Sequence, residues 1–343
     1  MHDLEARGHR VLVVTRPDTE FARRSNHAPA LILPGSRYYP LAGVGKLSRL
    51  AKNADVIHIH RSADLPLAAI AKVLARNRPA LVYSRHMAIS RDRRKSLVHR
   101  FMFRQVDMLL AITAQVAAAA RARLPLPAGR IRHLAPGVDA GPRPTDCSTL
   151  RPGGVDFVVG CFSRLEPAKG QHELLEALGK LKRQGIDIGA IIAGPAMNPA
   201  YTKRLHEQAA ETGLESQVHF AGALKDARPA MACCDAVVMP SQSETLGLVL
   251  IEAMLQGVPV IATAAGGVLE VINNGETGLT YPVGDTDALA RCLQRLREDP
   301  EFRAGLARAG QAMARERHDR SRHLAQLEEI LLSLQERKKP PTA

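Results

Sequence analysis

The sequence predicts an α/β protein with parallel sheets, divided into two domains. Short apolar runs alternate with segments of helical periodicity, which is typical of successive strand–helix–strand units. At 343 residues the chain is long enough for two domains. Residues 1–140 carry 24 Lys and Arg against 9 Asp and Glu, whereas residues 141–343 carry 23 against 25. The net charge of +13 therefore comes from the first part alone, which indicates two domains with different partners.

In the first domain, placed at residues 1–140, the chain begins with the end of a helix that stops at Gly8. We expect the strands of this domain at residues 11–14, 56–60, 80–83, 108–113 and 131–134. A linker follows at residues 141–154, because the stretch from Asp139 to Gly154 contains three Pro and three Gly.

The second domain is expected at residues 155–318 and repeats the same alternation. Its strands are predicted at residues 156–162, 188–193, 218–221, 236–239, 259–262 and 278–281. Helices are predicted over residues 171–184 and 200–212. A C-terminal helix at residues 319–337, with Leu327 and Leu334 on its apolar face, is expected to pack back on the first domain.

Composition favours a cytoplasmic protein. The most apolar segment, residues 108–120, is too short to cross a bilayer, and no stretch is typical of a signal peptide. The five cysteines are odd in number and form no Cys-x-x-Cys pair. We therefore expect free thiols without a disulfide or metal role.

Two carboxylates flank the start of a helix in the second domain. The segment PSQSETLGLVLIEAMLQG (240–257) follows a buried strand, with Glu244 in the loop and Glu252 on the second helical turn. Free amides near Gly247 and Leu248 favour an anion, and Gly247 permits a close approach. Carboxylates accept hydrogen bonds from sugar hydroxyls, so the segment predicts a site for a hydroxyl-rich, phosphate-bearing ligand.

A second candidate site follows the strand at residues 156–162. Arg164 and Lys169 lie where a strand ends and a helix begins, which is where open α/β sheets bind ligands. The two cations can converge on one anion, although surface ion pairing alone would explain them equally well. Beside the acidic loop, they favour a diphosphate site.

These motifs resemble the retaining, nucleotide-sugar-dependent glycosyltransferases of family 4, which have the GT-B fold of two Rossmann-like domains facing a cleft. The matching segments are FSRLEPAKG (162–170), VHFAG (218–222), PSQSETLGLVLIEAM (240–254), GVPVIATAAGG (257–267) followed by Glu270, and GETGL (275–279). The first half matches more loosely, through GHRVLVV, DVIHIH, SRHM and APGVD.

The resemblance implies donor binding in the second domain, acceptor binding in the first and catalysis in the cleft between them. The donor would be a nucleotide-diphosphate sugar, the acceptor a glycan or glycolipid, and no metal would be required. The implied roles are diphosphate binding by Arg164 and Lys169, ribose binding by Glu252, binding of the transferred sugar by Glu244, and contacts to phosphate and sugar from the amides of Leu246, Gly247 and Leu248.

His86 corresponds to a His that the family often places opposite the donor sugar; the alternative is a loop His held by hydrogen bonds. His58 and His60 alternate on one strand and suggest a metal site, but the resemblance favours a strand end near the cleft. Arg61 just beyond that strand is expected to touch the acceptor.

A basic run, RDRRK (91–95), precedes apolar residues that include Leu97, Val98 and Phe101. This pattern suits an anionic membrane surface or a phosphorylated lipid-linked acceptor; the alternative is a solvated basic face over the domain core. A nucleic-acid partner is disfavoured, because stacking aromatic residues and a nucleic-acid motif are lacking.

The leading interpretation is an enzyme of envelope polysaccharide or lipopolysaccharide synthesis, peripheral on the cytoplasmic membrane face. The alternatives are a transferase acting on a soluble acceptor of the sucrose or glycogen type, and a non-catalytic membrane-associated remnant. Members of the family begin with a strand and a Gly-rich loop before the helix that here starts at His2. Because that first strand is central to such a sheet, we expect about 20 further residues upstream in the natural protein.

Overall fold

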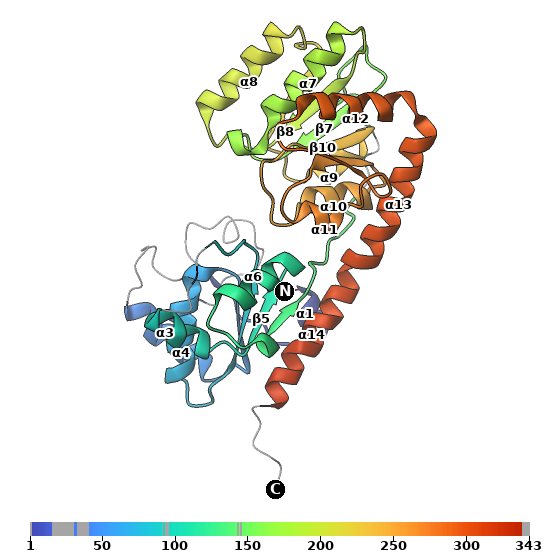
Figure 1. The fold of residues 1–343 in the computed structure, drawn as a ribbon. Helices are drawn as coiled ribbons and strands as arrows, with labels where there is room; N and C mark the ends of the chain where they lie inside the picture. The colour runs from blue at the N-terminus through green and yellow to red at the C-terminus, as the bar shows by residue number, and fades with distance from the viewer. Residues whose placement is uncertain are drawn as a thin grey trace. The chain divides into compact units, whose positions relative to one another are not determined.

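The structure is a computed structural model, which describes residues 2–15, 31–32, 41–90, 92, 96–142, 144 and 146–337. The chain forms two compact units, shown in Figure 1. Unit 1 comprises Met1–Pro136 and Ser321–Ala343, and unit 2 comprises Gly137–Arg320. In the described part of the chain, no helix is long and apolar enough to span a membrane.

Unit 1 is built on a parallel sheet of four strands, in the order β3-β4-β5-β6. These strands are β3 (Val56–Ile59), β4 (Ala80–Arg85), β5 (Met108–Ala111) and β6 (Ile131–His133). A separate parallel pair consists of β1 (Val14–Thr15) and β2 (Leu31–Ile32). The helices are α1 (His2–Ala6), α3 (Leu41–Ala51), α4 (Leu65–Leu74), α5 (Leu97–Arg104), α6 (Ala114–Arg123) and α14 (Arg320–Glu336).

Helices cover both faces of the four-stranded sheet. Successive side chains of a strand point to opposite faces, so Leu81 and Tyr83 of β4 pack in one core with α4, α5 and α6. Ala80 and Val82 lie in a second core with Leu327, Ile330 and Leu334 of α14. The last helix of the chain therefore completes unit 1, beside whose sheet it runs in Figure 1.

Unit 2 contains a parallel sheet of six strands in the order β12-β11-β10-β7-β8-β9. Its strands are β7 (Val158–Phe162), β8 (Gly189–Ala193), β9 (Val218–Gly222), β10 (Ala236–Met239), β11 (Val260–Thr263) and β12 (Leu279–Tyr281). Its helices are α7 (Gln171–Arg183), α8 (Pro199–Glu211), α9 (Arg228–Ala232), α10 (Leu248–Leu255), α11 (Val268–Val271), α12 (Thr286–Glu298) and α13 (Pro300–His318).

The α/β prediction with parallel sheets is confirmed. Every strand and helix predicted for the second half is present, with boundaries within two residues of those expected. In the first half, the strand predicted at residues 11–14 is wrong, because residues 11–13 have no regular structure and only Val14 belongs to β1. β1 pairs with β2 rather than with the four-stranded sheet, so the apolar run contributes no central strand in the part of the chain described.

The expectation of five free thiols is also wrong. Cys147 and Cys233 form a disulfide, with their Cα atoms 5.5 Å apart. The two residues are separated by 86 positions and meet because the linker segment around Cys147 lies against the end of α9. Arg151 holds this segment by donating to the carbonyl of Cys233 and to the Asp235 carboxylate. Cys161, Cys234 and Cys292 are free.

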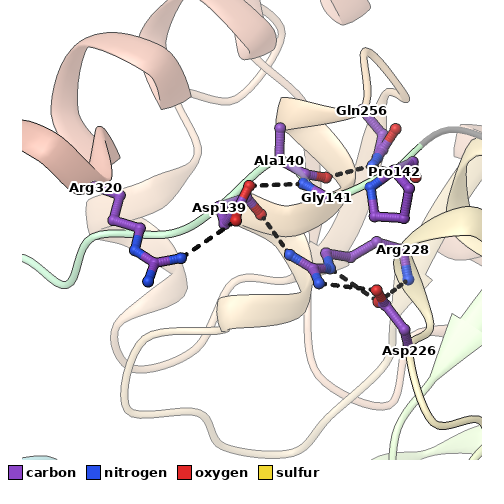
Figure 2. A network of polar contacts seen from close by, with 8 residues as sticks. All are labelled: Asp139, Ala140, Gly141, Pro142, Asp226, Arg228, Gln256 and Arg320. Atoms are coloured by element: carbon purple, nitrogen blue, oxygen red, sulfur yellow. Dashed lines mark hydrogen bonds and ion pairs between the residues drawn. The ribbon is translucent and has the colours of Figure 1, made fainter. Parts of the chain in front are cut away.

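The two ends of unit 2 are hydrogen-bonded to each other. The Val138 amide donates to the His318 carbonyl over 2.9 Å, and Arg320 pairs with Asp139 over 3.3 Å. Figure 2 shows the network around this point. Arg228 of α9 reaches the Asp139 carbonyl, and Gln256 just after α10 reaches that of Ala140. The start of unit 2 is thereby held on two of its helices.

Candidate functional site

The candidate site lies where the strand order of unit 2 reverses. β7 and β10 are neighbours, and the chain continues outward from them in opposite directions, to β8 and β9 on one side and to β11 and β12 on the other. In open α/β sheets, ligands bind beyond the carboxyl ends of the strands at such a point. The loops that follow β7 (163–170) and β10 (240–247) occupy this position.

These two loops are in direct contact. The Gln242 amide donates to the Ala168 carbonyl over 3.0 Å. Gly170 has φ +69°, and a Cβ atom there would lie 2.0 Å from the Pro240 carbonyl oxygen. A side chain at position 170 would therefore separate the loops.

The loop after β11 supports the acidic loop from another side. The Gly267 amide donates to the Glu244 carbonyl over 2.9 Å. A Cβ atom at Gly267 would lie 1.8 Å from the Thr245 carbonyl oxygen. Loops from three neighbouring strands thus define the backbone position of Glu244.

The side chains of Lys169 and Glu244 are paired, with 2.5 Å between Nζ and Oε1. They are 16% and 20% exposed. Arg164 is instead paired with Glu166 over 2.9 Å, and its side chain is more than half exposed. The structure therefore brings Lys169 and Glu244 together, while the expected convergence of Arg164 and Lys169 on one anion stays a prediction.

Gln171, which the sequence had not singled out, holds the first of these loops. Its side chain is fully buried, and Nε2 donates to Ser163 Oγ over 2.8 Å and to the Arg164 carbonyl over 2.9 Å. Its Oε1 accepts from the Tyr201 hydroxyl over 3.1 Å. A Gln in the first turn of a helix is usually solvated, so its position in the chain carried no sign of this role.

The N-terminus of α10 faces the same site. Gly247 adopts φ +86° as the N-cap residue, and among the described residues no side chain caps the amides of the first turn. Leu246 is buried in the core, so only its backbone is available to a ligand, whereas the side chain of Leu248 is exposed. Open amides at the positive end of a helix attract an anion.

Glu252 lies on the second turn of α10, as predicted, and is largely buried. Burial raises the pKa of this carboxyl, and the charge of Arg228 acts in the opposite direction. Arg228 forms a two-point ion pair with Asp226, with both distances 2.8 Å. Sequence reasoning did not identify Arg228, because Arg228 and Glu252 approach each other only through the contact between α9 and α10.

In unit 1, His58, His60 and His86 lie side by side at the ends of β3 and β4. His60 Nδ1 is 3.1 Å from His86 Nε2, and His58 Nε2 is 2.8 Å from Ser84 Oγ. Burial, reinforced by the neighbouring histidines, lowers the pKa of His58 to about 3. Burial and His86 lower the pKa of His60 to about 4. Within the described ranges, no group of three or more His, Cys, Asp or Glu side chains is arranged to hold a metal ion.

The structure buries some of the apolar residues that follow the basic run and leaves the others exposed. Met102 and Phe103 of α5 are buried in the core, whereas Leu97, Val98 and Phe101 are 77%, 66% and 48% exposed. Of the basic run itself, Arg91 and residues 93–95 lie outside the described residues.

Two family models match the chain over most of its length. Residues 150–313 match the glycosyl transferases group 1, and residues 1–141 match glycosyltransferase family 4. The solved structure of Anabaena Alr3699/HepE in complex with UDP and glucose is 31% identical, with a TM-score of 0.80, and the match covers 94% of this chain and 91% of that one. The chain belongs to the group 1 glycosyltransferases, and its two units have the GT-B architecture of that family.

Two of the curated relatives are named as enzymes of lipopolysaccharide core biosynthesis. The lipopolysaccharide core biosynthesis mannosyltransferase LpsB of Rhizobium meliloti is 29% identical, over 84% of this chain and 83% of its own length. The lipopolysaccharide core biosynthesis glycosyltransferase LpsE of the same organism is 34% identical over 45% of this chain. The chain spans less than half of LpsE, 43% of its length.

Proposed function

We propose that the protein is a retaining hexosyltransferase that moves a sugar from a nucleotide-diphosphate sugar to a glycan or glycolipid of the cell envelope. The observation that carries this proposal is the Lys169–Glu244 pair beside the open N-terminus of α10. A nucleotide sugar presents two phosphates and several hydroxyls, and this site combines a cation, a carboxylate and free amides.

In the proposed complex, the diphosphate contacts Arg164, Lys169 and the first amides of α10. Glu252 accepts hydrogen bonds from the ribose hydroxyls, and Glu244 accepts them from the transferred sugar. The amides of Leu246, Gly247 and Leu248 meet phosphate and sugar. Support comes from the contact between the two loops, which keeps Lys169 and Glu244 within one ligand's reach.

The same groups account for catalysis. Glycosyl transfer passes through an oxocarbenium-like state, while negative charge grows on the departing diphosphate. Cations and helix amides that are already in place stabilise that charge without reorganisation. Arg164 and Lys169 are sufficient for this role, so we propose that activity requires no metal ion.

Unit 1 is proposed to bind the acceptor, with His86 directed at the transferred sugar and Arg61 at the acceptor. The exposed Leu97, Val98 and Phe101 on α5 suit the surface of an anionic membrane, where a lipid-linked acceptor resides. The basic residues 91–95 precede this face in the chain and would add electrostatic attraction. The proposed location is therefore the cytoplasmic face of the membrane.

The test begins with a thermal-shift screen of UDP-, GDP- and ADP-sugars, since a ligand at 100 times its Kd stabilises by about 2.7 kcal/mol. Hydrolysis of the selected donor is then measured for the wild type, Glu244→Ala and Arg164→Ala. Glu215→Ala and Arg183→Ala change exposed residues of unit 2 and serve as matched controls.

We expect the two site variants to lose activity and the two controls to keep it. Equal activity in all four would contradict the assigned site. The anomeric configuration of the transfer product tests retention, and an inverted product would exclude a retaining enzyme. Activity that persists after dialysis against EDTA is expected if no metal is required.

A further inference from the structure

The side chain of Arg85, at the end of β4, holds the loop that carries His86. Its guanidinium donates to the backbone carbonyls of Met87 over 2.8 Å and Ala88 over 2.9 Å. It also donates to the Tyr83 hydroxyl over 2.8 Å and to the Ser62 hydroxyl in the segment after β3. Arg85 therefore links the turn after His86 to β4 and to the segment after β3, because a planar guanidinium can donate to several acceptors at once.

His86 has a second contact on the β3 side. His60 Nδ1 lies 3.1 Å from His86 Nε2, and the two rings stack with 16° between their planes. A hydrogen bond between two neutral imidazoles requires one protonated and one unprotonated nitrogen. The contact therefore couples the tautomers of the two rings and engages Nε2 of His86, which leaves its Nδ1 as the nitrogen available to a ligand.

We propose that Arg85 is a positioning residue for His86, which it holds together with His60 in one orientation. The proposal rests on the proposed function, in which His86 is directed at the transferred sugar. Arg85 itself does not contact the substrate. Its guanidinium is already engaged by four acceptors that belong to unit 1.

The charges around His86 support this role. The titratable groups that the structure sets against it are Arg85, the preceding residue at the end of β4, together with His58 and His60 at the end of β3. Burial, and after it the charge of Arg85, lowers the pKa of His86. A neutral His86 can hydrogen-bond to a sugar hydroxyl without placing a positive charge beside the oxocarbenium-like state.

The first test needs no enzymatic activity. The ring-nitrogen shifts of His86 are followed by NMR against pH in the wild-type protein, Arg85→Met, Arg85→Lys and Arg76→Met. Arg76→Met removes the same charge at an exposed position after α4 and is the matched control. His86→Gln identifies the resonance.

We expect the midpoint of His86 to lie below about 6.5 in the wild type and to rise towards that value in Arg85→Met. In Arg85→Lys it should rise less, because the charge remains while the multiple contacts are lost. The Arg76→Met curve should match the wild type. An unchanged midpoint in Arg85→Met, or an equal shift in Arg76→Met, would overturn the proposal.

The second test measures sugar transfer in a double-mutant cycle of Arg85→Met and His86→Gln. We expect Arg85→Met to lower kcat about 10-fold or more, since displacing a positioned group by 1 Å can cost 10²-fold. In the His86→Gln background, the Arg85→Met substitution should change kcat by less than about 2-fold. Equal losses in both backgrounds would show that Arg85 does not act through His86. A wild type that transfers no sugar would refute the proposed function, while the NMR titration would still decide the role of Arg85.

Discussion

Acid should destabilise unit 1 through His58. This imidazole lies on β3 against Ser84, and burial lowers its pKa from 6.5 to about 3. The native state thus binds fewer protons than the unfolded chain below pH 6.5, so stability is complete above that pH and declines as pH falls towards 3. Each pH unit within this window lowers the free energy of unfolding by about 1.36 kcal/mol. At pH 5 the expected loss from His58 alone is about 2 kcal/mol.

The measurement is urea unfolding at pH 7.5 and pH 5.0, followed by circular dichroism. His58→Gln keeps a partner for the Ser84 hydroxyl but cannot be protonated in this range. Between pH 7.5 and pH 5.0 its free energy of unfolding should therefore decrease by about 2 kcal/mol less than that of the wild type. His133→Gln, at an exposed position of β6, is the matched control and should behave as the wild type. An equal loss in His58→Gln and the wild type would refute the reasoning.

Three further predictions concern unit 2. Gln171→Met keeps the side-chain volume but deprives Ser163 and the Arg164 carbonyl of their hydrogen-bond donor, at a cost of about 1–3 kcal/mol for each unsatisfied buried group. The variant should therefore have a lower unfolding temperature and bind inorganic pyrophosphate more weakly, whereas the exposed control Arg183→Met should match the wild type in both measurements. Arg228→Met should raise the pKa of Glu252 further, so that more of this carboxyl is protonated at pH 6 than at pH 8. Nucleotide affinity, measured by calorimetry, should therefore fall more at pH 6 than at pH 8 in Arg228→Met, whereas the loss in Arg228→Lys should depend little on pH. Cys147→Ser should reduce the free energy of unfolding by about 2–4 kcal/mol, and a reducing agent should do the same to the wild type but nothing more to the variant.

Much of the fold could be predicted because strands in a parallel sheet are short, apolar on both faces and separated by helices. The central strands of unit 2, β7, β8, β10 and β11, are such runs, and β10, Ala236–Met239, was located to the residue. The run at residues 11–14 has the same composition but forms little strand, since a strand requires a paired neighbour as well as an apolar sequence.

The residues of the candidate site could be predicted where they depend on predicted strand ends. Arg164, Lys169 and Glu244 could be assigned to one edge of a sheet, because each follows a strand whose carboxyl end had been predicted. The pairing of Lys169 with Glu244 depends on β7 and β10 being neighbours, which the order of elements along the chain does not specify. Arg228 acts through a contact with a distant segment, and Gln171 acts through its burial under the loop after β7, so local sequence holds no signal for either role.

The hydrogen-bonded ends of unit 2 have a consequence for synthesis on the ribosome. Unit 2 is one continuous segment closed by Val138 and Asp319, so it can fold as soon as it has emerged. Unit 1 begins first but cannot bury Ala80 and Val82 against α14 until the chain has passed through unit 2. Domains usually fold in the order in which they are made, whereas this arrangement favours completion of unit 2 before unit 1. Until α14 has been made, one face of the sheet in unit 1 lacks the helix that covers it.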